Sequence, residues 1–374
     1  MKKENTCPFV FSVLLRAGLW GDGVQLTPYE PVDFEELYEL AEEQSSVGLV
    51  AAGLEKVEDR KIIKKEALPF LKRVYSVEKR NEAMNMFIGN VITKMRIAGI
   101  YAILVKGQGV AQCYERPLWR SSGDIDLFFD EDNYQRAKVY LTPLASHIDE
   151  EDTSRLHLGM IVDSWTLELH GTMRTKISSK VDRVIDEVQR DIFQNGSVRV
   201  WRNGDVDIFL PNPNNDTIIV FTHFIHHFYV GGIGLRQISD WCRLLWVYRD
   251  TLDQALLKGR LQRMGLMNEW KAFAALAVEV LGMPDNAMPF YSDAEHYRKK
   301  AMRIFDLVLE AGNLGHNKDS SYRTRYSIPI ICFITFVRRL GEFLRISTIF
   351  PGNARRFFVK YVFHRASSRA FQNM

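Results

Sequence analysis

The residue pattern changes between positions 98 and 211, and this change constrains the fold more than any other feature of the chain. Residues 101–105 form a continuous apolar run, which is typical of a strand buried on both faces, and residues 125–129, apolar except for Asp126, indicate a second buried strand. Two further runs, 157–162 and 165–170, are separated by only two residues, as in a β-hairpin. Helical stretches lie between these runs, so the segment predicts a mixed α/β domain.

Helical periodicity dominates on both sides of this segment. The stretch 33–43 opens with Asp33, which can cap a helix, and its apolar side chains fall on one face. Residues 59–97 indicate one or two long amphipathic helices, and further helical stretches follow between 216 and 311. We therefore expect an α+β chain in four parts: a helical layer at 1–97, an α/β domain that holds the site at 98–211, a helical domain at 212–320 and a basic amphipathic tail at 321–374.

Charge is distributed unevenly along the chain. With 46% hydrophobic and 25% charged residues, the composition is that of a globular protein and excludes an intrinsically disordered one. The formal net charge is only +3, but residues 321–374 hold nine Arg and one Lys against the single acid Glu342. Such a tail either binds an anionic partner, such as a membrane surface or a nucleic acid, or packs its arginines against the more acidic body.

The cysteines and the apolar runs bear on localisation. The four cysteines are far apart and form no CxxC pair, so neither a zinc site nor a disulfide framework is indicated. Reduced thiols fit a cytoplasmic protein. The apolar run at residues 8–15 ends at Arg16 and lacks a cleavage signal, so we interpret it as the first helix and not as a signal peptide. We expect no transmembrane segment.

The candidate chemistry is concentrated around an acid pair. In an extended strand side chains alternate, so Asp124 and Asp126 point to one side while Ile125 and Leu127 face the core. Two neighbouring carboxylates repel each other, and a hard divalent cation such as Mg²⁺ relieves that repulsion. Gly123, just before the pair, leaves room for a phosphate to approach. The simpler interpretation of such a pair alone is a solvated strand end.

A third acid lies on the predicted hairpin. Glu168 alternates with Leu167 and Leu169, so it faces away from the core on the same side as His170. Three carboxylates on neighbouring strands can hold two metal ions that activate an attacking hydroxyl and stabilise a transferred phosphoryl group. The simpler interpretations are an exposed acid on an alternating strand and a histidine with a structural hydrogen bond.

These motifs resemble a known family. LVKG followed by YERPLWRSSGDIDLFF is similar to bacterial nucleotidyltransferases of the DNA polymerase β-like superfamily, whose hallmark is Leu-Lys-Gly, then Tyr, then Arg-x-x-x-Asp-Ile-Asp-Leu. The similarity extends over about residues 33–250 and includes LELH for the strand of the third carboxylate, where the family usually has Asp in place of Glu168. The resemblance implies a polymerase β-like α/β core flanked by N- and C-terminal helical layers.

The resemblance also implies roles for single residues. Asp124, Asp126 and Glu168 would be the catalytic metal ligands, with Glu168 as third ligand or as the base that deprotonates the acceptor. The candidates for substrate binding are Lys106, Gly107, Arg120, Ser121, Ser122 and His170. The basic side chains would neutralise a triphosphate, the glycine would abut it and the serines would donate hydrogen bonds to it.

A second acid pair has a simpler explanation. Asp205 and Asp207 repeat the spacing of the first pair, but they follow Asn203-Gly204, a tight-turn signal, and no Lys-Gly turn precedes them. We therefore predict a turn at this position and not another metal site.

Two polar groups on the later helices remain open. His223 and His227 have the spacing of a zinc helix, but the Glu of the HExxH motif is absent. We therefore expect them, with His226, to line an interface between the helical layer and the α/β domain. Arg236 and Asp240 are spaced for an ion pair on one helix, which we favour, or Arg236 reaches a nucleotide.

Together the motifs predict a metal-dependent nucleotidyltransferase. It would move a nucleoside monophosphate from an NTP such as ATP to an acceptor and release pyrophosphate, with Mg²⁺ or Mn²⁺ as cofactor. We expect the acceptor to be a small molecule or a protein. The alternatives are template-independent transfer to RNA, which the basic tail would assist, and a catalytically silent nucleotide-binding module.

Overall fold

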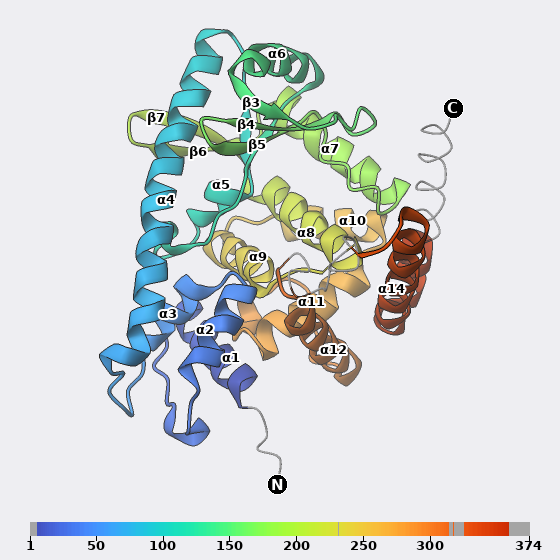
Figure 1. Ribbon diagram of the computed structural model, residues 1–374. Coiled ribbons are helices and arrows are strands. Elements are labelled where there is room, and N and C mark those ends of the chain that lie inside the picture. Colours follow the sequence, from blue (N-terminus) through green and yellow to red (C-terminus); the bar gives the residue numbers. More distant parts are fainter. Residues whose placement is uncertain (1–5, 231, 314–316, 318–324, 359–374) are drawn as a thin grey trace.

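The computed structural model describes residues 6–230, 232–313, 317 and 325–358. It combines many helices with a mixed β-sheet (Figure 1), so the predicted α+β organisation is confirmed. The carboxylate of Asp33 accepts hydrogen bonds from two backbone N–H groups and caps the following helix, as predicted. The N-terminal helices are α1 (Cys7–Trp20), α2 (Phe34–Glu43), α3 (Val47–Leu54) and α4 (Lys64–Ile97).

Five strands form one mixed sheet: β1 (Ile103–Val105), β2 (Ile125–Phe128), β3 (Ala145–Ile148), β4 (His157–Val162) and β5 (Trp165–His170). Their spatial order is β1-β2-β5-β4-β3, in which β2 and β5 are parallel and the other neighbours antiparallel. The predicted hairpin is confirmed, since β4 pairs with β5 across a two-residue turn. The edge strand β3 was outside the sequence prediction, because its mostly exposed side chains carry no burial pattern.

A separate two-stranded sheet consists of β6 (Val198–Asn203) and β7 (Val206–Pro211). Gly204, with φ of 59°, and Asp205 form its turn, so the turn predicted at the second acid pair is confirmed. The helices between the strands are α5 (Gly107–Ala111), α6 (Glu131–Leu141) and α7 (Ser179–Asn195).

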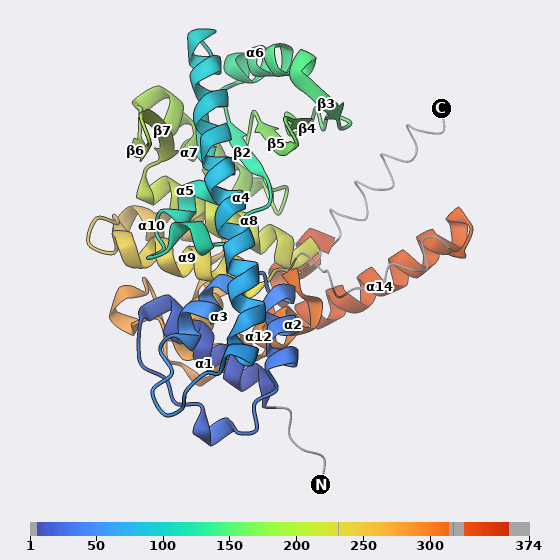
Figure 2. The ribbon, with the colours of Figure 1, turned by 60° about the vertical axis from the view of Figure 1, so that its left-hand side comes forward.

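The long helix α4 extends from the N-terminal helices to the sheet in both views (Figures 1 and 2). With α6 it covers one face of the five-stranded sheet, where Ile125 and Leu127 of β2 and Leu167 and Leu169 of β5 are buried. Because side chains alternate along a strand, the polar residues between these apolar ones point to the opposite face.

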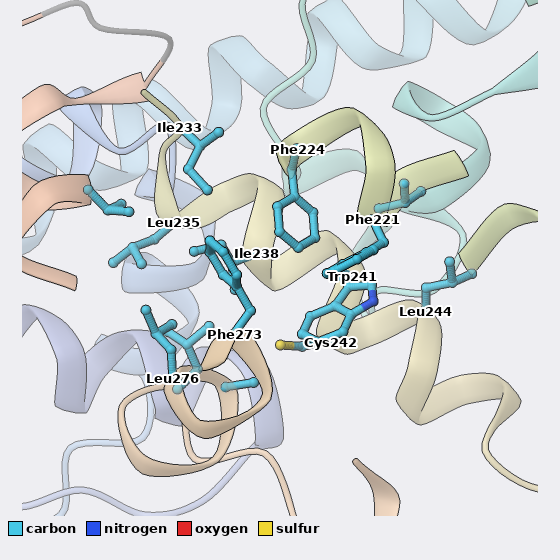
Figure 3. Close-up of a cluster of buried hydrophobic side chains, with 14 of the residues drawn as sticks. Phe221, Phe224, Ile233, Leu235, Ile238, Trp241, Cys242, Leu244, Phe273 and Leu276 are labelled. Atoms are coloured by element: carbon cyan, nitrogen blue, oxygen red, sulfur yellow. The ribbon is translucent and has the colours of Figure 1, made fainter. Parts of the chain in front are cut away.

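The C-terminal helices contribute much of the core. Phe221 and Phe224 pack on Trp241 with ring centroids 5.7 Å apart in each pair, and Phe224 packs edge-on against Phe273 (Figure 3). Full burial of one such side chain contributes about 1.5–3 kcal/mol. This packing therefore holds the helices that carry these rings in fixed positions relative to one another. The helices are α8 (Pro213–Val230), α9 (Leu235–Tyr248), α10 (Gln254–Met264), α11 (Met267–Glu279) and α12 (Glu295–Ala311).

Helix α14 (Ile328–Ile349) projects from the body of the molecule (Figure 2), and residues 351–358 after it are also helical. Phe333 near its start is exposed, whereas Ile349 at its end is buried, and Arg345 pairs with Glu310 of α12. No helix within the described ranges is long and apolar enough to cross a membrane. Residues 321–324 and 359–374 of the predicted tail lie outside the described residues. The anionic partner of the tail and the division of the chain into four parts stay predictions.

Candidate active site

Strands β2 and β5 place the three acids. Asp126 on β2 lies opposite Glu168 on the parallel strand β5, and Asp124 immediately precedes β2. One carboxylate oxygen from each of the three residues lies within 4.8 Å of the other two. The three acids named by the sequence are therefore together in space, close enough to share a cation.

The three carboxylates differ in exposure and in proton affinity. Asp126 is only 3% exposed, Glu168 is half-buried and Asp124 is exposed. The negative charge of Asp126, followed by desolvation in the cavity, raises the pKa of Asp124. Burial also disfavours the charged form of Glu168, but hydrogen bonds from His157 and His170 outweigh it and hold the pKa of Glu168 well below its usual range. A bound cation would relieve the repulsion that acts on Asp124.

Lys106 supplies the positive charge nearest to the acids. It joins β1 to α5 with φ of 56° and ψ of −143°, and Gly107 follows with φ of 36°. Positive φ is unusual for a lysine, and such strain is typical of functional sites. The turn holds Lys106 Nζ 2.5 Å from Asp126 Oδ1 and 3.5 Å from His223 Nδ1. Burial disfavours the ammonium, but the charges of the acids outweigh this effect and raise the pKa of Lys106.

Two histidines of the hairpin contact the same acids. His170 Nε2 lies 2.8 Å from Asp126 Oδ1 and 3.4 Å from Glu168 Oε2. His157 pairs with His170 across the hairpin, and its Nε2 lies 3.3 Å from Glu168 Oε2. Burial disfavours the imidazolium of His170, but its hydrogen bonds to the two acids outweigh burial and raise the pKa of His170.

The acids line a cavity of about 340 Å³ whose other side is formed by α8 and α9. His223, His226 and His227 line the α8 side, which agrees with their predicted place between a helical layer and the α/β domain. Burial, followed by the positive charge of Lys106, holds the pKa of His223 well below its usual range. Burial likewise lowers the pKa of His226 to about 3 and that of His227 to about 4. Neutral imidazoles therefore line this wall at neutral pH.

The guanidinium of Arg120 is held by Asp240. Its Nε and Nη2 each lie 2.7 Å from one carboxylate oxygen of Asp240, and the Tyr114 hydroxyl donates to the same carboxylate at 2.7 Å. Arg120 and Asp240 are 7% and 5% exposed, so this is a buried ion pair. The predicted ion pair between Arg236 and Asp240 is therefore wrong. Asp240 pairs across the fold instead, and Arg236 Nη1 donates to the backbone oxygen of Ser121 at 2.7 Å.

Arg236 also lines the cavity. Its Nε is buried and has no hydrogen-bond partner among the described residues. Burial, followed by the nearby charge of Arg120, lowers the pKa of Arg236 from its usual value. An anion bound in the cavity would satisfy the N–H and compensate the buried positive charge.

Ser121 and Ser122 belong to the segment that leads into β2. The Ser122 hydroxyl accepts a hydrogen bond from Gln108 at 3.0 Å, and Gln108 also donates to Asn81 at 2.9 Å. Asn81 in turn donates to two carbonyl oxygens of the segment, each at 2.8 Å. Within the described structure the cavity wall includes neither serine. These contacts fix the segment on α4 and thereby position Asp124.

The three acids have the donor chemistry of a site for a hard divalent cation. Mg²⁺ prefers carboxylate oxygens together with substrate phosphates, and Mn²⁺ accepts the same donors. Asp124, Asp126 and Glu168 each supply an oxygen within 4.8 Å of the other two, and the ammonium of Lys106 already provides a cation at Asp126. The residues therefore fit Mg²⁺ or Mn²⁺.

Sequence reasoning missed His157 as a site residue and set Arg236 aside. The hairpin held the signal for His157, because a two-residue turn between β4 and β5 fixes the register and places His157 opposite His170. No local pattern links Arg120 to Asp240, which is 120 positions further along the chain. The pairing that leaves Arg236 available to the cavity was therefore not readable from the sequence.

Comparison with known proteins gives a family for most of the chain. The model of a family described as uncharacterised nucleotidyltransferase matches residues 30–282, which is more than half of the sequence. The matched range includes the three acids, Lys106 and the helices α8 and α9 that line the cavity. Neither a curated protein nor a solved structure matches the chain.

Proposed function

The chain belongs to the family of uncharacterised nucleotidyltransferases, and from that membership we propose a metal-dependent enzyme that transfers a nucleoside monophosphate from an NTP to an acceptor. The observation that carries the proposal is the convergence of Asp124, Asp126 and Glu168 at one cavity. A volume of about 340 Å³ is within the range of small-ligand pockets. The acids on neighbouring parallel strands and the Lys106-Gly107 turn support a polymerase β-like core.

In the proposed reaction a nucleophile of the acceptor attacks the α-phosphorus of the NTP. The new bond joins the nucleophile to the α-phosphorus, and the bond between the α-phosphorus and the oxygen that bridges it to the β-phosphorus breaks. Pyrophosphate leaves with the electrons of that bond, and the proton of the nucleophile passes to solvent water. Divalent cations at the acids would supply the positive charge that stabilises the transferred phosphoryl group and the leaving group. The low pKa of Glu168 favours its role as a cation ligand over that of a base.

The contacts of the basic residues suggest different roles for them. Lys106, whose partner Asp126 would turn to the cation, would neutralise the phosphates beside Gly107. Arg236 has an unsatisfied N–H at the cavity and is better placed for a phosphate than Arg120, which is committed to Asp240. Arg120, which also lines the cavity, and the two serines before Asp124 would then position the acid, and the serines would not contact the substrate.

The acceptor is the open part of the proposal. We favour a small molecule or a protein, with RNA as the alternative that the basic C-terminal residues support. Transfer to RNA would weaken steeply with salt, because binding to phosphates releases counterions. A catalytically silent module would bind NTP without turnover. Labelling with α-labelled NTPs distinguishes transfer to RNA and silent nucleotide binding from transfer to a small molecule or a protein.

The experiment that tests the proposal measures where the α-phosphate of the NTP is transferred. The purified chain is incubated with α-labelled NTPs, Mg²⁺ or Mn²⁺ and cell extract, and label is measured in small metabolites, protein and RNA. We expect label in one fraction together with pyrophosphate, and loss of both in Asp124→Ala/Asp126→Ala. The matched control is Asp205→Ala/Asp207→Ala, which removes an acid pair of equal spacing on the β6–β7 hairpin and should keep activity. Equal labelling by the first variant would refute the site, and nucleotide binding without any labelling would favour the silent module.

A further inference from the structure

A second set of metal-ligating side chains adjoins the three acids. One donor atom each from His157, Glu168 and His170 lies within 4.8 Å of the others. Glu168 therefore belongs to two groups at once, one made of oxygen donors only and one that adds two imidazole nitrogens. The chemistry of the second group differs from that of the first, because nitrogen donors select different metal ions.

The separations in the second group match a coordination shell. Bonds of about 2.0–2.1 Å in a tetrahedral site place neighbouring ligand atoms about 3.3 Å apart. Glu168 Oε2 lies 3.3 Å from His157 Nε2 and 3.4 Å from His170 Nε2. Asp126 Oδ1 lies 2.8 Å from the same nitrogen, His170 Nε2, and is a further donor beside it. Small side-chain shifts would turn these contacts into metal bonds.

The four donors are held by regular strands. His157 and His170 are directly opposite each other on β4 and β5, with ring centroids 4.8 Å apart. Asp126 and Glu168 are paired on β2 and β5, and all four residues line the cavity. Ligands on paired strands are prearranged more firmly than ligands on loops, so little conformational entropy is lost on metal binding.

We propose that Asp126, His157, Glu168 and His170 form a binding site for a divalent transition-metal ion of the Zn²⁺ or Co²⁺ class. Two carboxylates and two neutral imidazoles would balance the charge of such an ion. Mg²⁺ keeps to oxygen donors, so it would occupy the neighbouring position at Asp124 and Asp126. The inference assigns the two cation positions to chemically different metals and so deepens the proposed function. It rests on the proposed function only for the role of the transition-metal ion in nucleotidyl transfer.

The first experiment uses Co²⁺ as a spectroscopic probe for this site. Metal-free protein is titrated with Co²⁺ in the presence of excess Mg²⁺, and binding is followed by visible absorption. We expect one tightly bound Co²⁺ that Mg²⁺ does not displace. Pulsed electron paramagnetic resonance of the native chain with one equivalent of Co²⁺ should show coupling to imidazole nitrogen, and this readout requires no variant.

The second experiment removes single ligands. His157→Ala and His170→Ala should each weaken Co²⁺ binding by more than about 100-fold, because even the loss of a hydrogen bond behind a ligand costs about 10–100-fold. The matched control is His147→Ala on the edge strand β3, where the histidine contacts Asp149 at 3.1 Å and is exposed. Its Co²⁺ affinity should equal that of the native chain. Circular dichroism establishes that each variant is folded.

The possible results separate this inference from the proposed function. Unchanged Co²⁺ affinity in both folded histidine variants, or a Co²⁺ spectrum without nitrogen coupling, overturns the transition-metal site even if the chain transfers nucleotides. If a variant does not fold, the Co²⁺ spectrum of the native chain decides. A nitrogen-ligated ion in a protein that labels no acceptor supports the site and counts against the transfer activity.

Discussion

Asp126 and Glu168 lie directly opposite each other on the parallel strands β2 and β5. Their side chains therefore leave the sheet on one face, while the leucines beside them are buried against α4 and α6 on the other. The two carboxylates come from strands that are separated in sequence by α6, β3 and β4. The candidate site thus depends on the pairing of these strands as much as on the acids themselves.

Loss of either acid should abolish transfer and leave the fold intact. Asp126→Asn and Glu168→Gln keep the shape of the side chains but remove the charge that holds a cation. A bound metal contributes several kcal/mol to phosphoryl transfer, so we expect a loss of about 1,000-fold in the rate of label transfer. The rate is measured at saturating NTP, with circular dichroism as the control for folding. Activity within tenfold of the native rate would exclude a catalytic role for the residue.

The buried ion pair of Arg120 and Asp240 should matter for stability. Asp240→Ala leaves a buried guanidinium without its partner, which costs about 3–5 kcal/mol in the free energy of unfolding. The matched control is Asp207→Ala, because Asp207 forms an exposed pair with Arg202 and such pairs contribute only about 0–1 kcal/mol. Urea denaturation measures both. Similar losses in the two variants would contradict the assignment of Arg120 to a structural role.

Two helical glycines should respond oppositely to alanine. A Cβ at Gly18 of α1 would lie 1.9 Å from the backbone oxygen of Leu49 in α3, whereas a Cβ at Gly341 of α14 meets no described atom within 4 Å. Gly18→Ala should therefore destabilise the fold by about 1–3 kcal/mol. Gly341→Ala should stabilise its helix by up to about 1 kcal/mol. Thermal denaturation measures the difference, and a neutral Gly18→Ala would show that α1 and α3 are not so closely packed.

Acid should destabilise the protein through the histidines of α8. The pKa values of His226 (about 3) and His227 (about 4) lie below the ordinary histidine value of 6.5. On acidification these histidines bind protons in the unfolded chain at a higher pH than in the folded protein. The free energy of unfolding therefore decreases as the pH falls from about 7 towards 4. His226→Gln should flatten this part of the curve, whereas exposed His147→Gln should not. Unfolding free energy measured against pH tests this, and parallel curves for native and His226→Gln protein would contradict it.

Local patterns predicted most of the elements. The apolar runs gave β2, β4 and β5 nearly to the residue, because strands buried on one or both faces leave a clear signature. The common orientation of the acids was also predictable, because alternation along β2 and β5 fixes the face to which Asp126 and Glu168 point. β3 escaped prediction because an exposed edge strand has no apolar run.

The remaining features depend on contacts between distant segments. Nothing near Asp240 in the sequence indicates that it turns to Arg120 and not to Arg236 on its own helix. The depressed pKa of His226 results from the packing of α8 over the cavity, which no periodicity reveals. Such properties arise from tertiary burial, so they require the assembled fold.

A crystal structure of the chain with Mn²⁺ and a non-hydrolysable NTP, in which anomalous scattering locates the metal, tests most directly whether the three acids hold a cation against a nucleotide. We expect a metal peak coordinated by Asp124, Asp126 and Glu168, with the triphosphate in the cavity beside Gly107 and Arg236. A nucleotide bound elsewhere, or a cavity in which Lys106 remains paired with Asp126 and no metal joins the acids, would contradict this expectation.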